Sequence, residues 1–77
     1  MKLIDAIIHR LRAIMAERGI TPYYFYKEGG IAKSTISQVF NEKQQNISMN
    51  LLYDFVSTLN MSLKDFFDDP IFDNLLD

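Results

Sequence analysis

The fold is decided by residues 21–42, which read TPYYFYKEGGIAKSTISQVFNE. Thr21 followed by Pro22 predicts the start of a helix, because a threonine hydroxyl can cap free backbone amides and proline fits the first helical position. We expect this helix, the second of the chain, to run to about Glu28. The glycine pair at 29–30 should end it, since glycine enters left-handed backbone geometry without steric cost. The stretch therefore begins with a short helix and a tight turn.

Residues 33–41 predict a third helix whose two faces differ in polarity. Its apolar side chains recur at helical spacing at Ile36, Val39 and Phe40, so the helix is expected to rest on that stripe. Hydrogen-bonding side chains gather on the other face: Lys33, Ser34, Thr35, Ser37 and Gln38. Such groups can donate to guanine, pair with adenine or contact a phosphate. Two short helices joined by a glycine turn, the second with this face, can present a helix to the major groove of DNA.

Three further helices are expected around this pair. The first should span residues 2–18, with a buried face made of Leu3, Ile4, Ile7, Ile8, Leu11, Ile14 and Met15. Ser48 should cap a fourth helix, whose buried face is Leu51, Leu52, Phe55, Val56 and Leu59. Ser62 and Asp65 match a capping box that opens a fifth helix, with Pro70 as its end and with an apolar face of Leu63, Phe66 and Phe67.

The predicted architecture is a single all-α domain. A chain of 77 residues has room for one core, and its 48% of hydrophobic residues can fill that core without disulfides or metal. No strand pattern, internal repeat or linker is visible in the sequence. We therefore expect a compact five-helix domain with a helix-turn-helix over residues 1–77, ending in a short C-terminal tail at residues 70–77.

Composition argues against metal and nucleophile chemistry. The chain has no cysteine and one histidine, His9, which lies outside the apolar stripe of the first helix and is expected on the surface. Metal motifs that need paired imidazoles or thiolates are absent, and nothing in the sequence orders a serine and an aspartate around His9 as in a hydrolase triad. We therefore expect no metal, no cofactor, no small-molecule ligand and no enzymatic activity. Charge interrupts the first residues before a signal peptide or a membrane span can form, and we expect a cytoplasmic protein.

The net charge of −2 hides a division along the chain. Residues 1–45 hold seven basic and four acidic residues, a net charge of +3, whereas residues 46–77 hold one lysine and six aspartates, a net charge of −5. The basic part could meet nucleic acid while the acidic part faces away. Ordinary scatter of surface charge explains this single observation equally well.

The same stretch resembles the helix-turn-helix of the Xre and Cro phage-repressor family. The resemblance rests on residues 21–42, with the Gly30-Ile31 turn and the run at 34–37, and on residues 59–67, which are similar to the family's closing pair of helices. It extends over roughly residues 3–69. It implies a five-helix fold, a transcriptional regulator, most often a repressor, that binds double-stranded operator DNA as a homodimer, and no catalysis.

The resemblance also assigns roles to single residues. It implies base contacts by Lys33, Ser34 and Gln38, with Thr35 and Ser37 nearby, and phosphate contacts by Asn41 and Lys43. Gln44 lies beside Lys43 in a loop that we expect to be exposed. The start of the second helix should also touch the DNA backbone. The DNA-binding set is thus Thr21, Tyr23, Lys33, Ser34, Thr35, Ser37, Gln38, Asn41, Lys43 and Gln44.

The sequence departs from the family pattern at several positions. Pro22 replaces a glutamine that touches phosphate, so that contact should shift to Thr21, Tyr23 or a backbone amide, or be absent. Ala32 replaces the usual serine or threonine cap of the recognition helix. An arginine–glutamate pair of the family falls on Met15 and Phe40, where apolar contact can take its place.

A run of four aromatic residues adds a further departure. Tyr26 occupies the place of a small alanine, which implies altered packing between the second and third helices. In the run at 23–26 we expect Phe25 in the core and Tyr26 partly so, whereas the hydroxyls of Tyr23 and Tyr24 could reach phosphates. Stacking of these rings on single-stranded bases is the alternative interpretation.

The tail and the choice of partner stay open at the level of sequence. An apolar stripe in the tail either joins two subunits or folds back on the first helix: Ile71, Phe72, Leu75 and Leu76. The polar face of the third helix could also be an ordinary solvated surface. A protein-interaction module on the same fold, such as an antitoxin-like protein that binds its partner through the acidic half, is the alternative function.

Overall fold

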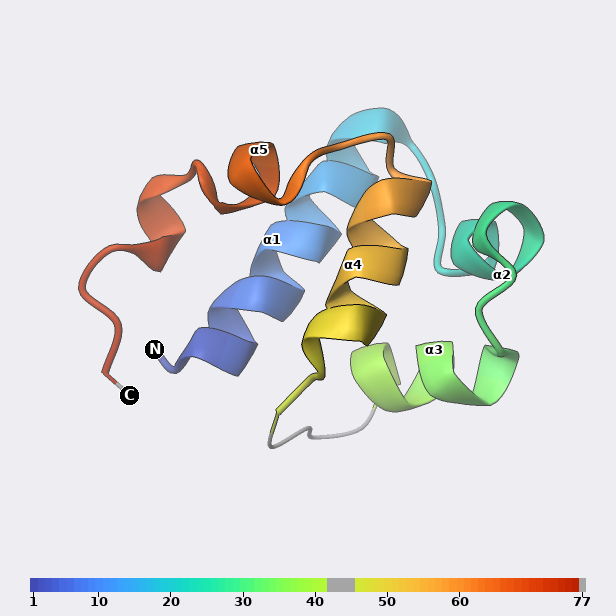
Figure 1. The fold of residues 1–77 in the computed structure, drawn as a ribbon, viewed down its shortest axis with the longest axis horizontal. Coiled ribbons are helices and arrows are strands. Elements are labelled where there is room, and N and C mark those ends of the chain that lie inside the picture. Colours follow the sequence, from blue (N-terminus) through green and yellow to red (C-terminus); the bar gives the residue numbers. More distant parts are fainter. Residues whose placement is uncertain (42–45, 77) are drawn as a thin grey trace.

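A computed structural model describes residues 1–41 and 46–76 of the chain. Within these ranges the chain forms helices and no strand, in agreement with the expected all-α class. The elements are α1 (Leu3–Arg18), α2 (Tyr23–Gly29), α3 (Lys33–Asn41), α4 (Met49–Thr58), α5 (Leu63–Phe67) and the short 3-10 helix η1 (Pro70–Phe72). Figure 1 shows α1 and α4 in the middle of the molecule, α2 and α3 at one end, and the red segment with η1 at the other, while α5 lies against α1.

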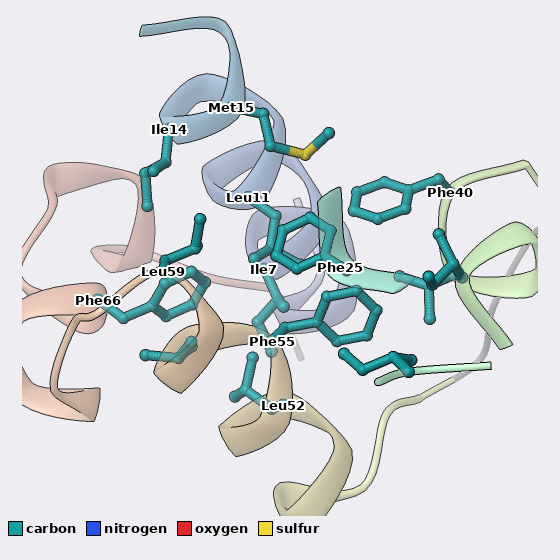
Figure 2. Packing of buried hydrophobic residues seen from close by; sticks show 14 residues of the cluster. Ile7, Leu11, Ile14, Met15, Phe25, Phe40, Leu52, Phe55, Leu59 and Phe66 are labelled. Atoms are coloured by element: carbon teal, nitrogen blue, oxygen red, sulfur yellow. The ribbon is translucent and has the colours of Figure 1, made fainter. Parts of the chain in front are cut away.

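One hydrophobic core joins the helices, and aromatic rings fill its centre. Phe25 of α2 packs against Phe55 of α4 and Phe40 of α3, with ring centroids 4.8 and 6.1 Å apart, and Phe40 lies 5.8 Å from Phe55. Leu11 of α1 and Phe66 of α5 are also fully buried in the same cluster (Figure 2). The stripe expected on α3, Ile36, Val39 and Phe40, is buried as expected.

The residues of the expected apolar faces are buried or, at Ile8, Leu51, Leu63 and Phe67, half-buried against the core, with one exception. Leu3 is 40% exposed, and the buried face of α1 begins at Ile4 and includes the fully buried Ala6 instead. Leu3 is the first helical residue, where the helix has only begun to lie against its neighbours. His9 is exposed, as expected.

The helix ends confirm some of the expected caps and correct others. Ser48 accepts a hydrogen bond from the amide of Leu51 at 3.1 Å, and Ser62 accepts one from the amide of Asp65 at 3.0 Å, so both serine caps are confirmed. The expected Thr21 cap is wrong: Pro22 already has helical backbone angles, and within the described residues α2 has no side-chain cap. The Thr21 backbone carbonyl accepts from the amide of Tyr24 at 3.0 Å instead.

The expected role of Pro70 is also wrong. Helix α5 ends at Phe67, and Pro70 begins η1, where its missing N–H costs nothing. The Asp69 carboxylate caps η1 by accepting from the amide of Ile71 at 2.9 Å.

The tail folds back on its own domain. Phe72 packs against Phe67 and Phe66, with ring centroids 4.8 and 5.8 Å apart, and η1 contacts α1. The amide of Leu76 donates to the carbonyl of Met1 at 3.1 Å, so the described ends of the chain lie side by side (Figure 1). Ile71, Phe72 and Leu75 are half-buried, whereas Leu76 is 81% exposed. Of the two roles left open for this stripe, the structure contains the fold-back.

The two glycines at 29–30 have different roles, which corrects the expectation that both serve the turn. Gly30 has a φ of +66° and forms the left-handed C-cap of α2. Gly29 is helical, and a Cβ there would overlap the side-chain oxygen of Thr58 in α4. The absence of a side chain at Gly29 therefore permits the close approach of α2 to α4.

Replacement of Gly29 tests this packing. In an open helix position Gly→Ala is stabilising, but here Gly29→Ala should lower the free energy of unfolding by about 1–3 kcal/mol because the new methyl group meets Thr58. Urea unfolding of the variant measures the change. In a Thr58→Ala background the same replacement should be close to neutral, and an equal loss in both backgrounds would contradict the steric explanation.

Candidate nucleic-acid interface

Helix α3 presents one polar face to solvent. Because Ile36, Val39 and Phe40 anchor the opposite side in the core, the remaining side chains point outward. Most of the residues expected to read DNA are exposed, namely Lys33, Ser34, Ser37, Gln38 and Asn41, and Thr35 is half-buried. The structure therefore gathers the expected α3 residues on a single surface. Lys43 and Gln44 lie outside the described residues.

Ser37 and Asn41 form a pair on this face. They stand one helical turn apart, and the side-chain amide of Asn41 donates to the hydroxyl of Ser37 at 3.4 Å. The contact leaves the Asn41 carbonyl oxygen and the second amide hydrogen free to bond elsewhere. Asn41 is thus oriented along the face of α3 at its C-terminal end.

The turn before α3 is built from backbone hydrogen bonds. The amide of Gly30 donates to the carbonyl of Tyr26 at 3.1 Å, and the amide of Ile31 donates to that of Phe25 at 3.2 Å. Ile31 is buried, which fixes the chain between the helices. The Ala32 carbonyl accepts the first helical bond of α3, from Ile36 at 3.0 Å, so Ala32 stands at the cap position with no side-chain oxygen to offer.

An arginine of α1 holds the other end of α3. Arg12 donates from its guanidinium to the backbone carbonyl of Phe40 at 2.5 Å and lies 5.2 Å from the centroid of the Phe40 ring. The family's arginine–glutamate positions, Met15 and Phe40, are both buried in the apolar cluster. The connection of α1 to α3 thus uses a backbone carbonyl in place of a carboxylate. Sequence reasoning missed it, since nothing local to Arg12 indicates a partner 28 residues away.

The aromatic run of α2 is arranged differently from the expectation. Tyr23 and Tyr26 are 56% and 41% exposed and share one face, with ring centroids 5.6 Å apart. Tyr24 is half-buried and packs edge-on to the buried Phe25. Tyr26 is therefore more exposed than expected, because residues three apart on a helix share a face and adjacent residues do not, while the phosphate contact of the Tyr24 hydroxyl stays a prediction.

The Tyr23–Tyr26 pair holds a lysine. The Lys33 ammonium lies 4.6 Å from the ring centroid of Tyr26 and 5.6 Å from that of Tyr23. The sequence offered a usable signal for this contact, the three-residue spacing of the two tyrosines and a lysine directly after the turn. Thr21 is exposed at the start of the same region.

Comparison with known proteins gives one result. The model of the Cro/C1-type HTH DNA-binding domain matches residues 10–70, which cover α2, α3 and the turn between them. Comparisons with curated proteins and with solved structures give no match. None of the helices in residues 1–41 and 46–76 has the length and hydropathy needed to cross a membrane.

Removal of the Arg12 guanidinium tests how α3 is held. Arg12→Met keeps the aliphatic stem but loses the bond to the Phe40 carbonyl, so the free energy of unfolding should fall by about 1 kcal/mol. Hydrogen exchange of the α3 amides should become faster. Lys2→Met removes a charge from the start of the same helix and should leave that exchange unchanged. Unaltered protection of α3 in Arg12→Met would contradict the role given to Arg12.

Proposed function

Because the chain belongs to the family of Cro/C1-type helix-turn-helix DNA-binding domains, we propose that it is a sequence-specific transcriptional repressor that reads double-stranded operator DNA with α3 in the major groove. The observation that carries the proposal is the difference between the two faces of α3. Its apolar stripe is buried, while most of its hydrogen-bonding side chains are exposed to solvent. Short polar groups on a firmly anchored helix can match the donors and acceptors of base edges.

We propose separate roles for single residues of this surface. Ser34, Ser37 and Gln38 lie on the outward face of α3 and are proposed to read bases. Asn41, at the end of the helix, and Lys43 after it are proposed to hold phosphates, with Thr21 and Tyr23 on the opposite flank. The contacts at the two flanks would fix the register, and the contacts in the middle would read the sequence.

We also propose that the operator is bound by a symmetric homodimer. A helix of nine residues spans only a few base pairs, which is too little to discriminate among genomic sites. Two copies would read two half-sites about one helical turn apart. The proposed interface is the side of the tail stripe, Ile71, Phe72, Leu75 and Leu76, that stays exposed after the tail has folded back on its own domain. Leu76 is its most exposed member, and an apolar side chain that is 81% exposed gains most from a second subunit.

Selection from a pool of random duplexes tests DNA binding and symmetry together. At low salt the protein should retain duplexes that share a near-palindromic site, and affinity for that site should fall steeply with salt. Leu76→Asp should shift the protein toward monomer in sedimentation and weaken operator binding, while its helical content stays unchanged. Failure to retain any duplex would exclude the proposed function and favour a protein partner. A wild-type protein that is monomeric on its operator would exclude the dimer.

Substitution of Gln38 tests the base-reading role. Gln38→Ala should weaken binding to the selected site by about 1–3 kcal/mol and relax preference at one base pair, because a glutamine side chain can make two hydrogen bonds to adenine. Competition with single-base variants of the site measures the preference. Lys43→Ala serves as the matched control and should weaken all sequences alike. Unchanged affinity and preference in Gln38→Ala would show that α3 is aligned wrongly on the DNA.

A further inference from the structure

The contact between Lys33 and two tyrosines joins the start of α3 to α2. Lys33 is the first residue of α3, and its ammonium stands over the rings of Tyr26 and Tyr23 at 4.6 and 5.6 Å from their centroids. The rings come from one face of α2 and are tilted by 43° to each other. A single cation thus contacts two aromatic faces, an arrangement that limits the positions its flexible side chain can take.

The contact of Lys33 with the two tyrosines contributes little to the stability of the fold. All three residues are exposed, so the contact buries little apolar surface. A lysine in the first turn of a helix also meets the partial positive charge of the helix N-terminus, which is unfavourable. The first turn of α3 has no acidic residue, and no carboxylate in the described part of the chain pairs with Lys33. The charge of Lys33 is therefore oriented without being neutralised, and the group that complements it is an anion.

The side of α3 on which the Lys33 ammonium lies indicates the class of anion that it binds. The rings that hold Lys33 belong to α2, and in a helix-turn-helix the helix before the recognition helix crosses the DNA backbone. Ser34, Ser37 and Gln38, in contrast, stand on the part of α3 proposed to face the bases. A lysine held on the α2 side is suited to a phosphodiester group, for which an ammonium needs charge and reach but no fixed pairing geometry.

We propose that Lys33, Tyr23 and Tyr26 form one phosphate-binding cluster, in which the two rings position the ammonium and the ammonium binds a phosphate of the operator backbone. Tyr26 is a positioning residue that acts through its ring, not through its hydroxyl. The inference rests on the proposed DNA binding and changes one assignment within it, since the family resemblance gives Lys33 a base contact.

Variants of Lys33 separate the two assignments. On the selected operator, Lys33→Ala should lower affinity by a similar factor for every single-base variant and should reduce the slope of log affinity against log salt by about 0.9 per subunit. Lys64→Ala removes an exposed charge from α5 and should leave this slope unchanged. A relaxed preference at one base pair, with the slope unchanged, would overturn the inference and leave the proposed function standing. If the wild-type protein bound no duplex, both would fall.

Variants of Tyr26 test the positioning role. Tyr26→Leu should lower operator affinity about two- to fivefold, the factor that corresponds to an exposed cation–π contact, whereas Tyr26→Phe keeps the ring and should bind like the wild type. In a Lys33→Ala background Tyr26→Leu should cause no further loss. Thermal unfolding of each variant checks that the fold is intact. Equal losses in Tyr26→Phe and Tyr26→Leu, or additive losses with Lys33→Ala, would overturn the role of the ring.

Discussion

The arrangement of the helices depends on three arginines of α1 that donate to backbone carbonyls at the C-terminal ends of other helices. Arg12 bonds the carbonyl of Phe40 in α3, Arg18 that of Leu59 after α4, and Arg10 those of Phe66 and Asp65 in α5. The last carbonyls of a helix lack intrahelical partners and carry partial negative charge. Each guanidinium therefore satisfies a carbonyl and complements a helix dipole, and α1 becomes the frame to which three helices are attached.

The attachment to α1 fixes the position and rotation of α3 on the core. Its apolar stripe alone would allow the helix to slide or rotate on the core, but the bond from Arg12 fixes its last turn, while the buried Ile31 fixes the chain before its first turn. At the far end of the molecule Arg10 also pairs with Asp69 at 3.2 Å and so ties the tail to α1. Arginines of α1 thus hold both the surface proposed to read DNA and the segment proposed to join subunits.

Local rules account for the part of the structure that the sequence predicted. Periodicity gave the helices and their buried faces, and the caps at Ser48 and Ser62 followed from a serine directly before each helical pattern. Contacts between distant residues could not be predicted in this way. Periodicity predicts which face of a helix is buried but not which residues of other helices that face contacts. The contact of α2 with Thr58 of α4, which requires glycine at 29, and the bond from Arg12 to the Phe40 carbonyl are therefore seen only in the folded structure.

The same limit applies to the count of charges, which does not tell which cations can reach the proposed interface. Three of the seven basic residues in the first 45 are engaged with helix ends, so few cations remain free to move toward phosphates. In a chain of net charge −2, the position of each remaining cation then matters more than their number. A carboxylate could orient Lys33 but would cancel its charge. Two aromatic rings orient the ammonium and leave its charge available to an incoming phosphate, which is the property that a sparsely charged DNA-binding surface requires.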